Sequence, residues 1–532
     1  MKQKNAPYNQ IAHFADLGDM LKKNAQTYQD DPAFQYEAKG KRIEITFQKL
    51  WDDVCALGTY FHQQGLERAK IAVVGKNSYE WILTYFAAAI GGHVIFPLDR
   101  ELSPEELLTL IDASGCDLLV YGGVKKDAAP VLAELEIAKL TFDQFDEVLS
   151  LGSEALQNGD TAFLNTNTSI DEICAVIYTS GTTGTPKGVM LSQRNLLSDA
   201  QHSLENLSIP KGTVMVLPLN HTFGFMAGVL CQVWVGYPVY INDSLHTILK
   251  SIQTAKPGHI SVVPLFIKSF YKNIWKNAEK QGKAKALKAL IKTSNQLRKV
   301  GIDMRRVFFK SVLDAFGGNL QMIITGGAPV EEFYLKAFDD LGIQIINGYG
   351  ITECSPIVAT NRTCWVKSGS VGLPIPGVHA KIENPNEDGE GEICIKGDIV
   401  MKGYYENPEA TARVLADGWF NTGDIGKIDA DGFLYITGRK KNMILTANGK
   451  NVYPEELEEL ISGIENVTEV IVYSENELIT AEIYAENGSV CHGQIKKDIM
   501  ELNKNLASYK QIRKIKFRSV EFEKTATKKI KR

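Results

Sequence analysis

The sequence has few cysteines and no strong excess of either charge. Its 532 residues include eight scattered cysteines with no CxxC pair, and the formal net charge is −5. The spacing argues against structural zinc and iron–sulfur sites, and isolated cysteines in a long chain favour free thiols in a reducing compartment. Because the chain has no net positive charge, we do not expect it to bind nucleic acid.

Long uninterrupted apolar runs are also missing. Residues 81–98 and 224–241 approach membrane length, but glycine, proline and polar residues interrupt both. We therefore expect each to be a buried helix that leads into a buried strand. The first residues contain no apolar segment of signal-peptide length, so we expect a cytoplasmic enzyme.

The remaining composition is that of a folded protein, and the length predicts two to four domains. Up to about residue 370, short apolar runs alternate with helical patterns such as 47–65, which predicts a parallel α/β sheet. Beyond it, residues 380–397 read as a hairpin in a β-rich module, and a small α/β unit follows from about Lys441. The expected strands of the sheet lie at 71–75, 93–98, 173–180, 214–219, 260–265 and 320–325.

The strongest chemical signal is the segment YTSGTTGTPKGV, residues 178–189. It follows an apolar strand and precedes a short strand and a helix that begins near Gln193. Glycines let backbone N–H groups converge, hydroxyls add donors and Lys187 adds charge, so the segment predicts a phosphate-binding loop. It is not a Walker motif, because Gly188 follows the lysine. A flexible linker is the alternative, but a linker needs neither the lysine nor the flanking strands.

A second signal is NGYGITE, residues 347–353, which follows the apolar run IQII. Its Gly-Tyr-Gly turn puts an aromatic ring at the carboxyl end of a strand, where open α/β sheets bind ligands. Thr352 and Glu353 add a hydroxyl and a carboxylate. Glu353 takes the place of the third glycine of a dinucleotide-binding fingerprint, and alone the segment could be a plain turn.

Eight motifs in a fixed order make the chain resemble the adenylate-forming superfamily of acyl-CoA synthetases, nonribosomal adenylation domains and firefly luciferase. The resemblance covers nearly the whole chain. The residues of the motifs are most similar to those of bacterial long-chain fatty acid–CoA ligases. The motifs are YTSGTTGTPKGV (178–189), LPLNHTFG (217–224), TGGAPV (325–330), NGYGITE (347–353), GEICIKG (391–397), FNTGD (420–424), GRKKNMILTANGKNVYPEE (438–456) and EKTATKKIKR (523–532).

The resemblance implies an α/β fold with two unequal domains. Residues 1–440 would hold two doubly wound α/β subdomains and a β-rich, barrel-like subdomain. Residues 441–532 would form a small mobile α+β domain that hinges at Lys441. The substrates and cofactors implied are ATP, Mg²⁺ and coenzyme A.

The resemblance also assigns roles around the nucleotide. Glu353 would bind Mg²⁺, Thr352 would contact the α-phosphate, and Lys187 would act beside the departing pyrophosphate. Joining a carboxylate to ATP brings two anions together, so neutralising charge is required there in any case. The expected nucleotide-binding residues are Thr179, Ser180, Gly181, Thr182, Thr183, Gly184, Gly326, Gly327, Ala328, Asn347, Gly348, Tyr349, Gly350, Asp424 and Arg439.

Within this set Tyr349 would lie against adenine and Asp424 would bind the ribose hydroxyls. Arg439 would contact either the ribose or a phosphate. Carboxylate oxygens suit two adjacent O–H donors. Asp424 ends a Thr-Gly-Asp sequence, so it could also serve only as a turn cap.

Two further expectations concern the C-terminal domain. Lys529 would stabilise charge in the adenylation transition state, as a lysine near the C-terminus does in the superfamily. Lys528 stands where the superfamily usually has glycine, which leaves the register open by one residue, and a basic tail could simply be solvated. Gly449, in the loop 446–453, would line the coenzyme A tunnel after the domain rotates.

His221 would border the acyl pocket, although a lone histidine is more often structural. The residues after it, among them Phe223, Ala227 and Gly228, would line that pocket, and the small ones would leave room for a long chain.

The sequence therefore predicts an ATP-dependent acid–thiol ligase. It would form acyl-AMP and pyrophosphate from a fatty acid, then transfer the acyl group to coenzyme A and release AMP. Two alternatives have the same chemistry. One is a ligase that uses the thiol of an acyl carrier protein, and the other is a ligase for aryl or short-chain acids. A non-catalytic scaffold or lipid-binding relative is disfavoured by the presence of Lys529, Glu353 and Asp424.

One segment stands apart in charge. Residues 268–310 carry thirteen lysines and arginines against two carboxylates, Glu279 and Asp303. The segment is either a solvated helix on a core or a surface that docks on an anionic membrane or an acidic carrier protein. Its expected apolar helical face comprises Leu287, Leu290, Ile291, Leu297 and Val300.

Overall fold

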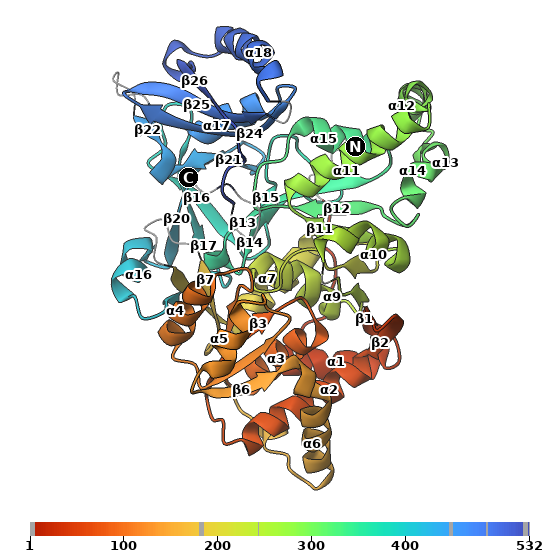
Figure 1. Cartoon of the computed structure of the whole chain (residues 1–532), viewed down its shortest axis with the longest axis vertical. Helices are drawn as coiled ribbons and strands as arrows, with labels where there is room; N and C mark the ends of the chain where they lie inside the picture. Colours follow the sequence, from red (N-terminus) through yellow and green to blue (C-terminus); the bar gives the residue numbers. More distant parts are fainter. Residues whose placement is uncertain are drawn as a thin grey trace.

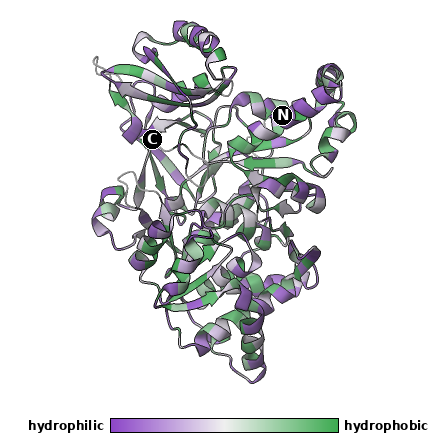
Figure 2. Cartoon of the chain, viewed as in Figure 1, coloured by the Kyte–Doolittle hydropathy of each residue, from purple (hydrophilic) through white to green (hydrophobic). Residues whose placement is uncertain are grey.

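The computed structural model describes residues 6–179, 186–242, 244–445, 451–485, 488–524 and 530. Figure 1 shows the first helices and strands of the chain, in red and orange, in the lower half of the molecule and the C-terminal unit, in blue, at the top. The strands at the centre are mostly coloured as hydrophobic in Figure 2, as expected for sheets that are covered by helices.

The largest sheet has seven strands in the order β18-β8-β7-β4-β3-β5-β6. The strands from β7 to β6 are parallel, whereas β8 is antiparallel to β7 and β18 is antiparallel to β8. The predicted strands at 71–75, 93–98 and 173–180 are confirmed. The bounds are β3 (Lys70–Gly75), β4 (Val94–Leu98), β5 (Leu118–Gly122), β6 (Ala138–Thr141), β7 (Ile173–Thr179), β8 (Lys187–Ser192) and β18 (Gly403–Tyr404).

Helices of the N-terminal part begin at residues that cap them. The Ser78 hydroxyl accepts a hydrogen bond from the backbone N–H of Trp81, and Ser103 and Glu106 form a capping box. The helix expected near Gln193 begins there, behind the cap Ser192. The bounds are α1 (Leu17–Tyr28), α2 (Phe47–Gln63), α3 (Tyr79–Ile90), α4 (Pro104–Ser114), α5 (Ala128–Glu134), α6 (Phe145–Gln157) and α7 (Gln193–Asn206).

Two smaller sheets follow, in the orders β2-β1-β10-β9 and β11-β12-β13-β14-β15. The predicted strands at 260–265 and 320–325 are present in shortened form. The bounds are β1 (Pro32–Ala38), β2 (Lys41–Thr46), β9 (Thr213–Val214), β10 (Val239–Tyr240), β11 (His259–Val262), β12 (Met322–Thr325), β13 (Gln344–Gly350), β14 (Ile357–Thr360) and β15 (Leu373–Pro374).

The predicted strand at 214–219 is mostly wrong, because only β9 pairs there. Pro218 has no N–H to donate to a ladder. The side chain of Asn77 replaces a strand partner: its Nδ2 donates to the carbonyl of Leu217 at 2.9 Å, and its Oδ1 accepts from the N–H of Leu219 at 3.1 Å.

The β-rich module contains the predicted hairpin at 380–397, formed by β16 (His379–Glu383) and β17 (Gly391–Lys396). Its sheet has the order β16-β17-β20-β19, with β21 paired to β20. These strands make an open sheet and do not close into a barrel within the described part of the chain. The other bounds are β19 (Leu415–Ala416), β20 (Trp419–Ile428) and β21 (Leu434–Arg439).

The C-terminal unit has a hydrophobic core of its own, formed by residues such as Val452, Leu457, Ile483 and Ile495. Its three-stranded sheet has the order β24-β25-β26, and Pro454 opens α17 as expected. The bounds are β22 (Ile444–Leu445), β23 (Asn451–Val452), α17 (Pro454–Ser462), β24 (Val467–Glu475), β25 (Leu478–Ala485), α18 (His492–Lys504) and β26 (Lys514–Arg518).

The two apolar stretches of near-membrane length behave as expected, since α3 leads into β4 and the short helices after His221 lead into β10. Nowhere in the described ranges does a helix combine the length and apolarity needed to span a bilayer. The remaining helices are α8 (Thr222–Phe225), the π-helix η3 (Met226–Leu230), α9 (Cys231–Trp234), α10 (Ile248–Ala255), α11 (Pro264–Lys280), α12 (Ala284–Lys299), α13 (Arg305–Phe308), α14 (Lys310–Asp314), α15 (Glu332–Asp340) and α16 (Pro408–Val414).

Candidate active site

Two of the sequence-predicted segments meet at the carboxyl ends of β12 and β13. The strands are parallel, and Thr325 is paired with Asn347 at their last shared position. A Cβ added to Gly326 would lie 3.2 Å from the carbonyl oxygen of Gly348, and Gly327 has a φ of +80°. The close approach and the left-handed turn both favour glycine, so the glycines of TGGAPV and NGYGITE are what let the two turns pack together.

This edge of the sheet contains unsatisfied polar atoms. The hydroxyl of Thr325 and Oδ1 of Asn347 are both buried and have no hydrogen-bond partner among the described residues. Buried polar atoms are normally paired, and an unpaired one points to a missing water or ligand. The paired positions of Thr325 and Asn347 therefore favour a polar ligand at this edge.

Tyr349, Asp424 and Arg439 form one hydrogen-bonded group. The hydroxyl of Tyr349 donates to Oδ2 of Asp424 at 2.6 Å, and Nε of Arg439 lies 2.8 Å from Oδ1 of the same carboxylate. Asp424 and Arg439 face each other on β20 and β21. Burial, together with the Asp424 carboxylate, raises the pKa of Tyr349, so its hydroxyl stays protonated and donates. Three motifs that are far apart in sequence thus converge on one carboxylate.

Thr352 and Glu353 lie in the short helical turn η5 (Thr352–Cys354), directly after β13. The Thr352 hydroxyl is 3.1 Å from that of Thr222, the first residue of α8. His221 precedes Thr222 at the start of that helix and is partly exposed. The predicted phosphate contact and the predicted border of the acyl pocket are therefore neighbours.

Glu353 has a partner that the sequence did not indicate. Its Oε1 accepts a hydrogen bond of 2.9 Å from the hydroxyl of Tyr404 on β18. The ammonium group of Lys187 lies over the Tyr404 ring, 4.8 Å from the centroid. β18 pairs with β8, with Tyr404 opposite Val189, which brings this ring beside the predicted phosphate-binding loop. No motif or spacing marked Tyr404 in advance.

Hydrogen bonds from neighbouring segments hold the turn that carries Glu353 in place. The N–H of Met401 donates to the carbonyl of Glu353 at 2.9 Å, and the Ser355 hydroxyl donates to the carbonyl of Ile399 at 2.7 Å. Oδ2 of Asp199 on α7 accepts from the N–H of Ile357 at 3.1 Å. Asp199 is fully buried, and burial raises the pKa of this carboxyl well above its usual range.

A void lies beside Gly228, one of the residues expected to line the acyl pocket, and its volume of about 10 Å³ is about that needed for one water molecule. Typical small-molecule pockets have about 300–1,000 Å³, so a long acyl chain needs side chains to move. Gly228 lines it from the π-helix η3, where a Cβ would lie 3.9 Å from Met215. His221, Phe223 and Ala227 were also expected at the acyl pocket, but they are not among the residues that line this void. The void is lined by Thr213, Val214, Met215, Val216, Leu217, Gly224, Gly228 and Ser261.

Several predicted site residues lie outside the described residues. They are Ser180, Gly181, Thr182, Thr183 and Gly184 of the phosphate-binding loop, together with Gly449 and Lys529. The described ends of the loop are fixed, because Thr179 is paired with Lys187 across β7 and β8. Of the other C-terminal lysines, Lys524 forms ion pairs with Glu469 and with Glu521, so it is engaged structurally.

Comparisons with known proteins identify the family and the fold of this chain. The model of the AMP-binding enzyme family matches residues 21–405. A long-chain fatty acid–CoA ligase of Mycobacterium tuberculosis is 29% identical over 476 residues, which cover 83% of this chain and 78% of that protein. Long-chain fatty acid–CoA ligase 6 of Mus musculus is 29% identical over 499 residues, covering 86% of this chain and 69% of that protein.

Solved structures have the same fold. MatB of Rhodopseudomonas palustris with bound ATP aligns with a TM-score of 0.77 and 24% identity, over 97% of both chains. The o-succinylbenzoate CoA synthetase of Bacillus subtilis, in complex with its acyl-adenylate intermediate, aligns with a TM-score of 0.75 and 23% identity, over 96% of both chains. Because the family model covers well over half of its residues, this chain belongs to the AMP-binding enzyme family.

Proposed function

We propose that this AMP-forming acid–CoA ligase takes a long-chain fatty acid as its substrate. In the first step the acid attacks the α-phosphate of ATP, forming acyl-AMP and releasing pyrophosphate. In the second step the thiol of coenzyme A attacks the acyl carbon, forming the thioester and releasing AMP. The observation that most supports the first step is the convergence of Tyr349, Asp424 and Arg439 on one side and of Glu353, Tyr404 and Lys187 on the other. The similarity to long-chain fatty acid–CoA ligases supports the choice of acid.

The nucleotide is proposed to lie along the carboxyl ends of β12 and β13. Gly326 to Ala328 and Asn347 to Gly350 would line the adenine site, where Asn347 Oδ1 and the Thr325 hydroxyl lack partners among the described residues. Asp424 would accept hydrogen bonds from the ribose hydroxyls, because carboxylate oxygens are acceptors suited to two adjacent O–H donors. The phosphates would then extend toward Thr352 and Lys187.

The residues present fit a magnesium ion that arrives with ATP. Among the described residues no group of three or more His, Cys, Asp or Glu side chains could hold a metal by itself. Mg²⁺ commonly binds one or two carboxylates together with substrate phosphates, so Glu353 alone suffices as a protein ligand. When bound, the ion neutralises phosphate charge. Tyr404 holds the Glu353 carboxylate in place for it.

The C-terminal residues complete the proposal. Lys529 would stabilise the negative charge that develops during adenylation. A rotation at Lys441 would then exchange it for the loop 446–453, with Gly449 beside the coenzyme A thiol. Such an exchange keeps water from a reactive mixed anhydride between the two steps.

The acid class and the acceptor are the parts to be measured first. We would supply acids from acetate to oleate, and aromatic acids, and record pyrophosphate release with and without coenzyme A. We expect the highest kcat/KM with long-chain acids, and thioester only when coenzyme A is present.

Each other outcome changes a specific part of the proposal. Preference for an aromatic or short acid would replace the fatty acid and leave the ligase chemistry. A protein-bound thioester formed with acyl carrier protein, and none with coenzyme A, would replace the acceptor. If no acid released pyrophosphate, the enzyme assignment itself would fail.

A further inference from the structure

The helix α12 presents one stripe of lysines to solvent. Lys285, Lys288, Lys292 and Lys299 are separated by three, four and seven residues, which places them within one narrow sector of the helix. All four are exposed, and none forms an ion pair with a described residue. Lys288 also lies over the ring of Trp275, at 5.6 Å from the centroid. We call these four residues the lysine stripe.

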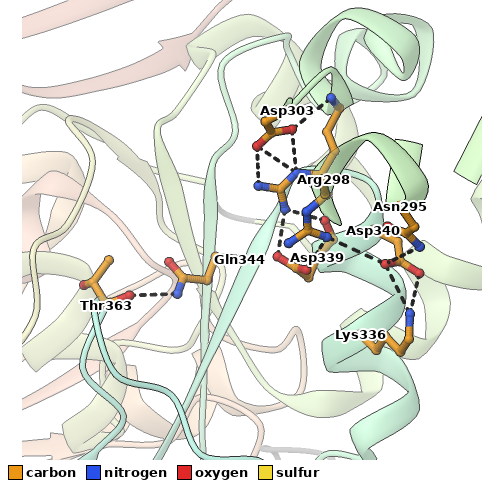
Figure 3. Close-up of polar contacts among 9 residues, drawn as sticks. Asn295, Arg298, Asp303, Lys336, Asp339, Asp340, Gln344 and Thr363 are labelled. Carbon is orange, nitrogen blue, oxygen red and sulfur yellow. Dashed lines mark hydrogen bonds and ion pairs between the residues drawn. The ribbon is translucent and has the colours of Figure 1, made fainter. Parts of the chain in front are cut away.

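The acidic groups near α12 are already paired with other residues. Arg298 lies 2.9 Å from Asp339 of α15, and Asn295 donates to Asp340 at 3.0 Å (Figure 3). Lys336 pairs with Asp340 at 3.0 Å in the same group. The network fixes α12 against α15 and neutralises these carboxylates, so it leaves the positive charge of the lysine stripe uncompensated.

The segment after α12 is held in the same way. Arg305 contacts Asp303 at 2.7 Å and Asp339 at 2.8 Å. The hydrogen bond from Arg305 lowers the pKa of Asp303 to about 2, so that carboxylate stays ionised and paired. A fixed backbone here means that the neighbouring exposed side chains have a defined direction.

Three apolar side chains project from this fixed segment. Val300 is 72% exposed, Ile302 48% and Val307 65%. We call them the apolar tip, and the basic residues Lys299, Arg306 and Lys310 flank them. The expected single apolar face of the helix is therefore wrong in part: Leu287 is buried, whereas Leu290 is 38% exposed and Val300 is 72% exposed.

A stripe of lysines beside exposed aliphatic side chains is the pattern of a surface that lies on a membrane. Lysine ammonium groups bind anionic headgroups, and aliphatic side chains enter the boundary between headgroups and acyl chains. The stripe runs from Lys285 to Lys299 and is about 21 Å long at 1.5 Å per residue, which suits an extended flat partner. We propose that the lysine stripe and the apolar tip dock this protein on an anionic lipid bilayer.

The position in the fold favours a membrane over an acidic carrier protein. α12 packs on α11 and α15, and α15 packs on β13, so helices separate the surface from the strand that carries Tyr349 (Figure 1). A carrier protein has to bring its thiol to the site, and this surface faces away from it. The lipid, in contrast, need only hold the protein where a poorly soluble acid is concentrated.

The test is sedimentation of the full chain with lipid vesicles. We expect wild type to bind phosphatidylcholine vesicles that contain phosphatidylglycerol, and not vesicles of phosphatidylcholine alone. Binding should weaken from 0.1 M to 1 M salt, since the Debye length shrinks from about 10 Å to about 3 Å. Replacing the lysine stripe by glutamate should lower affinity for the anionic vesicles by about 100-fold or more. The four changes are Lys285→Glu, Lys288→Glu, Lys292→Glu and Lys299→Glu.

A matched control carries the same change of net charge on exposed lysines elsewhere. Its changes are Lys22→Glu, Lys41→Glu, Lys126→Glu and Lys497→Glu, and it should bind nearly as well as wild type. Replacing the apolar tip with serine should weaken binding that persists at high salt, whereas serine at the exposed Val490, Met500 and Val520 should not. Activity on a short water-soluble acid should be unchanged in every variant, which also shows that each is folded.

Three results would overturn the docking surface. The stripe variant could bind vesicles as well as wild type, or wild type could fail to bind the anionic vesicles. Binding to acyl carrier protein, lost in the stripe variant without any vesicle binding, would assign the surface to a protein partner. None of these results depends on which acid the enzyme activates, so the proposed function is tested separately.

Discussion

The hydroxyl of Tyr404 donates a 2.9 Å hydrogen bond to the Glu353 carboxylate, and the same ring lies under the ammonium group of Lys187. Burial, aided by the Glu353 charge, raises the pKa of Tyr404, so the phenol remains a donor at any physiological pH. One side chain thereby links the carboxylate proposed to bind Mg²⁺ with the lysine proposed to act beside pyrophosphate.

Replacing Tyr404 with phenylalanine should impair the first half-reaction. The ring and its contact with Lys187 would remain, but Glu353 would lose the donor that orients it. A hydrogen bond to a charged group contributes about 1.5–3 kcal/mol, so we expect pyrophosphate release to fall by about 10-fold to 100-fold. The Mg²⁺ concentration that gives half-maximal rate should rise as well.

The neighbouring tyrosine provides the control. The hydroxyl of Tyr405 donates to the backbone carbonyl of Ser114 at 3.3 Å and has no contact with Glu353. Tyr405→Phe should therefore leave the Mg²⁺ dependence as in wild type. Equal losses in the two variants would mean that Tyr404 acts only in packing.

Asp424→Asn should weaken ATP binding more than the chemical step. The carboxylate contacts Tyr349 and Arg439 and is proposed to bind the ribose, which does not react. Interactions that are equal in ground state and transition state affect KM and leave kcat unchanged. We expect the KM for ATP to rise about 10-fold or more. A fall in kcat at unchanged KM would place Asp424 nearer the reacting atoms.

The start positions of secondary structure could largely be predicted from the sequence, and the contacts across the site could not. Ser192 and Pro454 indicate the starts of the helices that follow them, because helix capping and the fixed φ of proline depend only on local sequence. Tyr404 meets Glu353 only because β18 pairs with β8, a strand more than 200 residues earlier. The failed strand prediction at 217–219 has a similar cause. The side chain of Asn77, about 140 residues earlier, binds the backbone of Leu217 and Leu219, and no local sequence pattern indicates this contact.

Lys529→Ala should stop adenylation and spare thioester formation. Removing a positioned group that stabilises transition-state charge commonly costs about 10²–10³ in rate. Pyrophosphate release should fall by that factor, while thioester formation from supplied acyl-AMP and coenzyme A should persist. Lys528→Ala is the matched control, and a larger loss there would shift the assignment by one residue. The ion pairs of Lys524 with Glu469 and Glu521 favour a structural role for that lysine.

Gly449→Leu should have the opposite effect to Lys529→Ala on the two half-reactions. A bulky side chain beside the proposed path of the thiol would block thioester formation, whereas pyrophosphate release would continue. Measuring both products in one reaction separates the two effects. Equal loss of both half-reactions would mean that Gly449 matters for folding or for the first step.

His259 should make the stability of the enzyme fall on acidification. It is fully buried on β11; its Nδ1 donates to the carbonyl of Pro210 at 2.7 Å, which leaves Nε2 to accept from the amide of Gln232 at 3.1 Å. Burial lowers the pKa of His259 to about 4. The unfolded chain binds its proton near pH 6.5, so the contribution of His259 is present above pH 6.5 and is lost as pH falls from there toward 4.

At pH 5 this loss amounts to about 2 kcal/mol relative to neutral pH. His259→Asn keeps a donor for Pro210 but cannot titrate, so its urea midpoint should shift less between pH 7 and pH 5 than that of wild type. The comparison removes the contributions of other groups, including His93, which is buried and has its pKa lowered in the same way. The exposed His246→Asn variant should shift as wild type does. If His259→Asn and wild type lose the same stability over this range, the buried imidazole is not the group that responds to pH.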